Sequence, residues 1–193
     1  MPTLDEALDA TTIANIGHIY YAPVGTPWPD LSTFEFTGED WGAWKWLGDT
    51  SAENLPEFEA DEDEDANKRT WDRKNTRNGG KITGTINGVA LTKEFFSITK
   101  SGGKEEADGY VTTIRTTSKA WKILIVVEDG AWATGLGLYV AALKAGLRTH
   151  DLENYTEVPV NVTAEPDAEG NLYKDFLAVK MTAVAGEAPG VGG

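Results

Sequence analysis

The sequence predicts a mainly β protein of eight or nine strands with one short helix, and three observations lead to that prediction. Glycine occurs 21 times and proline eight times in 193 residues, which supplies turns for many short strands. Residues 158–164 alternate between small apolar and other side chains, as in a strand with one buried face. Residues 121–127 are nearly all apolar, which is typical of a central strand.

The beginning of the chain is expected to form two strands. Residues 17–23 alternate so that Ile19 and Tyr21 share one face, and the prolines that follow stop the strand. Residues 44–46 put two tryptophans on one face of the second strand. Residues 48–49 are expected to make the turn after it.

The middle of the chain is expected to add strands and the helix. Phe34 and Phe36 alternate with polar residues and indicate a short edge segment. Residues 81–89 alternate as a strand does, whereas residues 91–99 have apolar side chains at helical spacing and a threonine near the start as a cap. Residues 136–147 fit both patterns, and their glycines favour a strand.

The connections and the last strands follow from turn residues and β-branched composition. Residues 102–109 are expected to be a loop, and residues 110–117 a strand. Pro159 indicates that its strand lies at an edge of the sheet. Residues 167–171 predict a hairpin turn, after which residues 172–181 pair back.

We expect residues 16–184 to form a single β domain with a flexible segment at each end. Residues 1–15 form either a mobile arm or a short helical turn, for which Thr3 and Glu6 suit a capping box. Residues 185–193 contain mostly glycine, alanine and proline, which predicts a disordered tail.

The charge and composition exclude several classes of function. Seventeen basic against 31 acidic residues give a formal net charge of −14, which argues against attraction to nucleic acid phosphates or anionic membranes. The chain has no cysteine, so disulfides and thiolate metal sites are excluded. No secretory signal is visible, and no apolar segment approaches the ~18–20 residues that span a bilayer. We therefore expect a soluble protein that is made in a cytoplasm and has no membrane anchor.

Residues 61–78 carry charges of both signs and very few apolar side chains. An acidic block comes first, and basic residues follow it around a single tryptophan. Blocks of like charge seldom fold alone, so we expect a long hairpin or a loop that folds against a partner. The candidate contact residues are Asp61, Glu62, Asp63, Glu64, Asp65, Lys68, Arg69, Trp71 and Arg73.

The sequence contains no recognisable catalytic or metal site. Its two histidines, His18 and His150, have no cysteine or repeated carboxylate spacing near them, so we assign both to structural roles. Residues 167–171 resemble a fragment of a calcium loop but are better explained as a turn. We expect neither enzymatic activity nor a cofactor.

One alternative function is carbohydrate binding. A β-sandwich module could use Trp41, Trp44 and Trp46 as a surface on which sugar rings stack. Packing of these rings in a core or at a subunit interface is the simpler interpretation, because three tryptophans near one strand carry a large apolar area.

A further pattern runs through much of the chain. Its first part consists of Gly17, Tyr20, Ala22, Pro23, Gly25, Thr26 and Pro29, then Trp46, Leu47, Gly48 and Ser51, and then Trp71 after the charged stretch. Its second part consists of an acidic turn at residues 151–154, then residues 155–162, residues 167–171 and Phe176. This order of features resembles the major tail tube proteins of long-tailed, non-contractile bacteriophages, particularly those of actinobacterial hosts.

The resemblance implies a β-sandwich or barrel of tail-tube type, flanked by a helix and related in fold to the type VI secretion tube proteins. It implies that six copies close a ring, that rings stack into a hollow tube, and that DNA passes through the lumen during ejection. Contacts with tape-measure, terminator and distal tail proteins are implied as well, as are assembly in the host cytoplasm and a place in the virion. In this interpretation, residues 61–78 make the contact between stacked rings.

Overall fold

The described part of the chain is mainly β, with one short α-helix, as the sequence predicts. The computed structural model describes residues 17–34, 39–50, 56–61, 80–88, 92–100, 102–113, 119–129, 132–147 and 158–181. Its elements are β1 (Gly17–Pro23), the 3-10 turn η1 (Leu31–Thr33), β2 (Lys45–Asp49), β3 (Glu57–Asp61), β4 (Lys81–Gly88), α2 (Lys93–Thr99), β5 (Lys104–Glu106), β6 (Gly109–Val111), β7 (Ala120–Asp129), β8 (Trp132–Ala145), β9 (Val158–Glu165) and β10 (Tyr173–Lys180).

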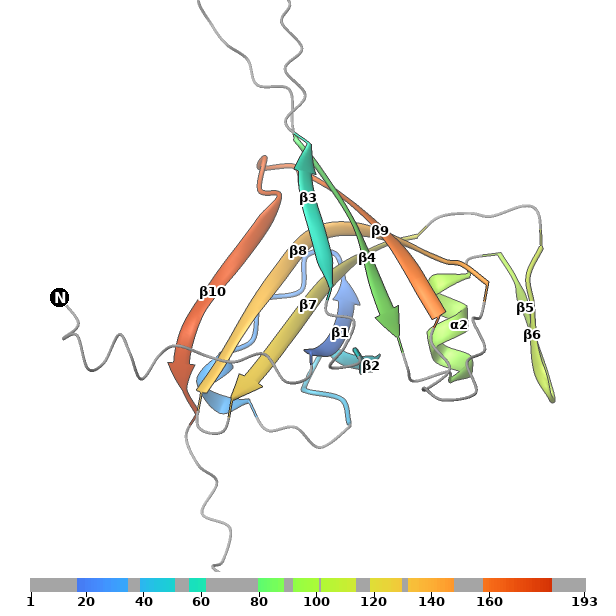
Figure 1. Cartoon of the computed structure of the whole chain (residues 1–193), viewed down its shortest axis with the longest axis horizontal. Helices are drawn as coiled ribbons and strands as arrows, with labels where there is room; N and C mark the ends of the chain where they lie inside the picture. Colours follow the sequence, from blue (N-terminus) through green and yellow to red (C-terminus); the bar gives the residue numbers. More distant parts are fainter. Residues whose placement is uncertain are drawn as a thin grey trace, which may run out of the picture.

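The main sheet is antiparallel and curls around an interior. Its strand order is β2-β1-β7-β8-β9-β4-β3, and β10 also pairs with β8 (Figure 1). Thr50, directly after β2, forms a β-bridge with Gly88 at the end of β4, so the two sides of the curl meet. β8 is long enough to be shared, because residues 140–145 pair with β9 and residues 132–138 pair with β10. This arrangement agrees with the expected sandwich or barrel.

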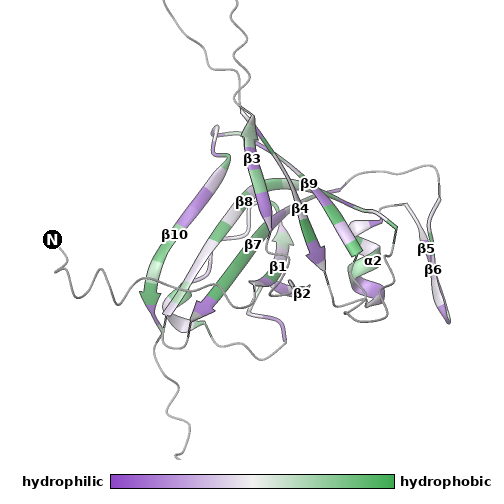
Figure 2. Cartoon of the chain, in the orientation of Figure 1, coloured by the Kyte–Doolittle hydropathy of each residue, from purple (hydrophilic) through white to green (hydrophobic). Residues whose placement is uncertain are grey.

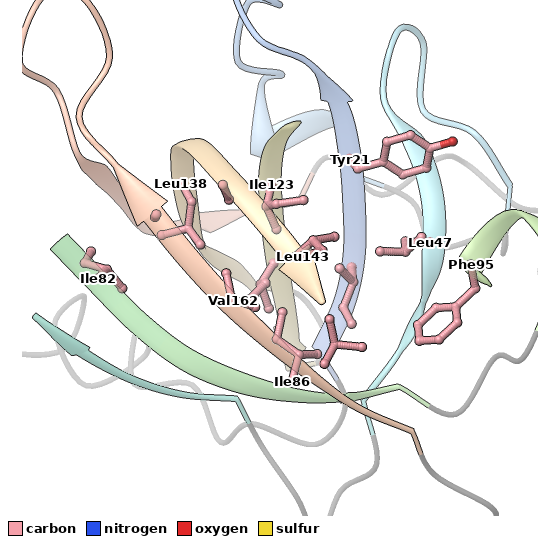
Figure 3. Packing of buried hydrophobic residues seen from close by; sticks show 14 of the residues in the cluster. Tyr21, Leu47, Ile82, Ile86, Phe95, Ile123, Leu138, Leu143 and Val162 are labelled. Atoms are coloured by element: carbon pink, nitrogen blue, oxygen red, sulfur yellow. The ribbon is translucent and has the colours of Figure 1, made fainter. Parts of the chain in front are cut away.

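Alternate side chains of the curled sheet fill its interior. Ile19 and Tyr21 of β1 meet Ile123 and Ile125 of β7 there, together with aliphatic side chains of β4, β8 and β9 (Figure 3). The helix contributes Phe95, which is 2% exposed. Removal of this apolar surface from water, worth ~25 cal/mol per Å², is the main stabilising term of the fold.

The intervening residues of β1 and β7 face an aromatic cluster on the other side of the sheet. Tyr20 and Leu124 pack there with Phe34 and Trp44. Trp41 joins them, with its ring centroid 5.9 Å from that of Tyr20 and 5.3 Å from that of Phe34. β1 and β7 are therefore covered on both faces, which explains why β7 is nearly all apolar (Figure 2).

The predicted helix and the predicted strand after residue 135 are both confirmed. α2 begins after Thr92, whose side-chain oxygen accepts a hydrogen bond of 3.1 Å from the backbone N–H of Phe95. β8 contains Gly137 because the Trp28 ring lies directly above it, and a Cβ there would be 2.5 Å from that ring. Within the described residues, no helix has the length and apolar character needed to cross a membrane.

The prediction of a turn at residues 48–49 is wrong, because both residues belong to β2. The pairing of β1 with β2 shifts between Ile19 and Tyr20, which leaves Leu47 as an extra residue and makes a β-bulge. Gly48 takes a φ of 141° at this bulge, a conformation that side chains of other residues disfavour. The glycine that indicated a turn in the sequence belongs to a β-bulge in the structure.

The edge segment predicted at Phe34 is a tight turn instead. Asp30 caps η1, since its Oδ1 accepts hydrogen bonds from the Ser32 backbone N–H at 3.0 Å and from the Ser32 hydroxyl at 2.8 Å. Phe34 follows this turn and is buried in the aromatic cluster. Phe36 lies outside the described residues.

The loop predicted at residues 102–109 contains a hairpin made of β5 and the start of β6. The ring of Tyr110 stacks on that of Phe96 in α2, with 6.4 Å between centroids, and its hydroxyl donates to the carbonyl oxygen of Lys100 at 3.0 Å. The helix therefore holds the hairpin, which a local sequence pattern does not reveal. β6 includes the first two residues of the strand predicted at 110–117, and residues 114–117 lie outside the described residues.

Two predictions about the last strands are wrong. Pro159 lies in β9, which is an interior strand between β8 and β4, and its carbonyl oxygen accepts a hydrogen bond from Gly146. The turn at residues 167–171 is confirmed, because Asp167 Oδ1 accepts hydrogen bonds from the backbone N–H groups of Glu169 and Asn171. However, β10 pairs with β8 rather than back onto β9, because the long β8 offers the same edge to both.

Candidate assembly surfaces

Three strands of the main sheet, β2, β3 and β10, pair with only one other strand within the described part of the chain. β3 pairs with β4, and β10 pairs with β8. The edge of β2 differs, because the Thr50–Gly88 bridge closes its end and Lys45 Nζ lies 3.6 Å from Glu94 Oε1 of α2. A free edge presents backbone N–H and C=O groups that can pair with a strand of another chain.

β3 presents an acidic edge. Glu57 and Glu59 are exposed, whereas Phe58 turns inward and packs against the interior cluster. Gly84 of β4 makes this approach possible, because a Cβ there would lie 2.3 Å from the Glu57 carbonyl oxygen and 2.4 Å from the Phe58 ring. β3 can therefore lie this close to β4 only because residue 84 has no side chain.

The predicted stacking residues begin where β3 ends. Asp61 is the first residue of the charged stretch and the last residue of β3, and it pairs with Lys81, the first residue of β4 (Figure 1). The other predicted contact residues lie outside the described residues: Glu62, Asp63, Glu64, Asp65, Lys68, Arg69, Trp71 and Arg73.

β10 presents an apolar and mainly basic edge. Leu177 is 83% exposed and Tyr173 is 48% exposed. The charged side chains of the strand are two lysines, Lys174 and Lys180, and one aspartate. Hydrophobic and hydrophilic stretches follow one another along this strand (Figure 2). Large exposed apolar side chains on a free strand edge mark a surface for association.

The three tryptophans of the carbohydrate-binding alternative belong to the aromatic cluster. Trp44 is 2% exposed, stacks on Trp28 with 5.2 Å between ring centroids, and donates a 3.0 Å hydrogen bond from Nε1 to the carbonyl oxygen of Pro27. Trp41 and Trp46 are half-buried against the same cluster. A sugar platform needs exposed ring faces, which Trp44 lacks, so the structure favours core packing and does not support the alternative.

Comparison with known proteins identifies the family of the chain. A family model described as phage tail tube protein matches residues 6–172. The chain belongs to the phage tail tube protein family. It is also 31% identical over 176 residues to the major tail protein Gp23 of Mycobacterium phage L5, a match that covers 80% of this chain and 84% of that protein. The resemblance to phage major tail tube proteins is thereby confirmed.

Family membership establishes the general role. A tail tube protein is a structural component of the phage tail and hence of the virion. It assembles with copies of itself and with other tail proteins. The free edges of β3 and β10 are therefore surfaces on which a partner is expected.

This tail tube protein holds a buried histidine between two carboxylates. His18 Nδ1 lies 2.8 Å from Asp49 Oδ1, and its Nε2 lies 3.5 Å from Glu128 Oε1. Trp46 Nε1 also donates to Asp49 Oδ1 at 3.1 Å. These contacts join β1 to β2 and β7, which agrees with the structural role predicted for His18. Within the described residues, no three histidines, cysteines or carboxylates gather as a metal site would require, and His150 lies outside them.

A buried lysine, which the sequence reasoning missed, holds the loop after β1. Lys122 Nζ donates a 2.7 Å hydrogen bond to the carbonyl oxygen of Thr26 and lies 3.9 Å from the centre of the Trp28 ring and 5.0 Å from that of Tyr139. Burial lowers the pKa of Lys122, and the charge of Asp167 opposes that change. The sequence feature that could have indicated this contact is the single lysine within the apolar run of β7.

Proposed function

We propose that six copies of this chain close a ring, that rings stack into a hollow tube, and that the phage genome passes through the tube during ejection. Family membership supports the tube. Ring formation is supported by two different strand edges, those of β3 and β10, which have no second neighbouring strand among the described residues. Contacts between two different surfaces repeat head to tail, and they generate a ring when the rotation closes.

The chemistry of the two edges supports a direct contact between them. We propose that β10 of one copy lies beside β3 of the next. Lys174 and Lys180 would then approach Glu57 and Glu59, and Leu177 would be covered. The pairing would also satisfy the backbone groups that each edge leaves exposed.

The charged stretch at residues 61–78 is the proposed contact between rings. Asp61, its first residue, pairs with Lys81, so the chain leaves the sheet and returns to it at one place. Its acidic block and its basic block can make complementary contacts with a neighbouring ring. The proposed contact residues remain those between Asp61 and Arg73 that the sequence predicts.

Deletion of residues 63–73 tests this contact. The shortened chain is expected to fold, because a change in the length of a surface connection costs little free energy. It is expected to lose tube growth, because rings lack their contact. Thermal melting measured by circular dichroism checks the first expectation, and electron microscopy checks the second. Tubes of normal length would remove the stretch from the mechanism.

The remaining parts of the proposal concern organisation and partners. We propose that residues 16–184 act as one folding unit and that residues 1–15 and 185–193 lie outside it. Tape-measure, terminator and distal tail proteins are the further proposed partners, with assembly in the host cytoplasm. The net charge of −14 supports free passage of DNA, because acidic subunits repel phosphates.

Negative-stain electron microscopy of the purified protein tests the proposed function. The protein is examined over a range of concentrations and salt, with and without fragments of assembled tubes as seeds. Hollow tubes built from rings with six-fold symmetry are the expected result. Monodisperse monomers under every condition, seeded ones included, would contradict the proposal.

A further inference from the structure

Strands β8, β9, β4 and β3 are hydrogen-bonded neighbours and together carry one outward face. In β4, Ile82 and Ile86 point into the interior, so Thr83 and Thr85 between them point outward. In β9, valine side chains likewise point inward. Asn161 therefore shares the outward face with the threonines of β4.

The register of the strands arranges this outward face in rows. One row runs from Glu59 of β3 to Thr83, then Thr163, and ends at Ala142 of β8. Directly opposite residues in antiparallel strands point to the same side, so each row is a line of neighbouring side chains. The next row consists of Glu57, Thr85, Asn161 and Lys144.

The chemistry of the rows is polar and mostly uncharged. Hydroxyl and amide groups occupy the middle of the face. Three glutamates (Glu57, Glu59 and Glu165) and two lysines (Lys81 and Lys144) lie around them, and the apolar side chains are Val140 and Ala142 of β8 and Pro159 of β9. Strands β3, β4, β8 and β9 contain no arginine. The free edge of β10 is different, because it exposes Leu177 to 83%.

We infer that this outward face lines the lumen of the tube and faces duplex DNA in transit, an inference that rests on the proposed tube. A surface along which DNA slides must not hold it. Arginine and clustered lysine bind phosphates, and exposed aromatic rings stack on bases. Threonine and asparagine instead keep a hydrated surface, and glutamates among them repel phosphates. The apolar edge of β10 suits contact with protein, so it does not compete for this role.

The absence of cysteine from the chain allows a direct test of where the face lies in assembled tubes. Thr83→Cys and Asn161→Cys each introduce a single thiol on the face. Each variant is treated, as tubes and as unassembled protein, with a small maleimide and with a maleimide on a polyethylene glycol chain too bulky to enter the tube. Unassembled protein is the matched control and is expected to react with both reagents.

In tubes, the small reagent is expected to label both positions and the bulky reagent to lose its labelling. Equal labelling by both reagents would place the face on the outside of the tube and overturn the inference. Protection from both reagents would place it in a subunit contact and overturn it as well. Failure of the unmodified chain to form tubes contradicts the proposed function itself, and electron microscopy detects that failure separately.

Contact with DNA is tested by adding cations to the face. Tubes of the double variant Thr83→Arg and Thr163→Arg are expected to retain short duplex DNA in a sedimentation assay, whereas unmodified tubes release it. The matched control adds two arginines at Glu105 and Glu106 of the β5–β6 hairpin, which lies away from the face (Figure 1). Retention by the control alone, or by neither variant, would contradict the assignment of the face to DNA.

Discussion

The interior strands of the sheet differ from the edge strands β3 and β10 in how far their apolar side chains are buried. β7 is covered on both faces, and its Leu124 and Val126 are fully buried. β10 lies at a free edge, and its Leu177 is 83% exposed. Burial in the monomer stabilises the fold, whereas an exposed apolar side chain at a free edge gains burial only from a partner. We infer that folding depends on the interior strands and that assembly depends on β3 and β10.

The largest expected effect on the monomer comes from the interior. Leu124→Ala is expected to lower the free energy of unfolding by about 2–5 kcal/mol, because it removes buried methyl groups and leaves a cavity. The same change at the free edge, Leu177→Ala, is the matched control and is expected to stay within about 0.5 kcal/mol. Urea denaturation of the two variants measures both values. Equal losses of unfolding free energy in the two variants would contradict the proposed difference between the interior strands and the free edge.

A smaller effect is expected at the buried lysine. Lys122→Ala is expected to cost about 1–3 kcal/mol, because it leaves the Thr26 carbonyl without its donor and removes the cation from the Trp28 ring. Lys122→Met keeps most of the volume and is expected to cost less. Denaturation with urea separates the two variants. A methionine variant as stable as the unmodified protein would show that the contacts of the ammonium group do not contribute as described.

The free edge of β10 is expected to matter for assembly alone. Leu177→Glu is expected to leave the unfolding free energy within about 0.5 kcal/mol and to abolish tubes, because it places an acid opposite the acidic β3 of the next copy. Leu147→Glu is the matched control, since Leu147 is 86% exposed and follows β8. Electron microscopy and denaturation are the measurements. Loss of tubes in the control but not at Leu177 would refute the role of β10.

The smallest effect is expected from the charges of β3. Glu57→Lys combined with Glu59→Lys is expected to slow tube growth at low salt, and the difference is expected to shrink at high salt because ions screen exposed charges. Adding Lys174→Glu and Lys180→Glu is expected to restore growth, since the signs are again opposite. Light scattering during assembly measures the rates. Growth that stays slow in the fourfold variant would argue against this pair of edges.

Local patterns predicted the elements whose environment is uniform along their length. The apolar run of β7 and the alternation in β9 are consequences of burial on two faces and on one face, so each strand could be found from its own residues. The helix was recognisable because Thr92 caps it and apolar spacing follows. The mainly β fold class with one short helix could therefore be predicted from the sequence.

Features that depend on contacts between residues far apart in the sequence could not be predicted from local patterns. β10 pairs with β8 because β8 is long enough to serve two strands, a fact that lies in neither sequence segment alone. The bulge at Gly48 and the contact of Lys122 with Trp28 likewise need the tertiary structure. The free edges could not be named from the sequence, because the strand order decides which strands lack a second neighbour.

Cross-linking of assembled tubes tests the central claim most directly. In a chain without cysteine, Glu59→Cys on β3 and Lys174→Cys on β10 provide the only two thiols, and a short bismaleimide joins thiols that lie close together. Head-to-tail pairing of β3 with β10 predicts a ladder on a denaturing gel that ends at six linked copies, and neither single variant is expected to give it. Dimers as the largest product, or no cross-links within intact tubes, would contradict the account.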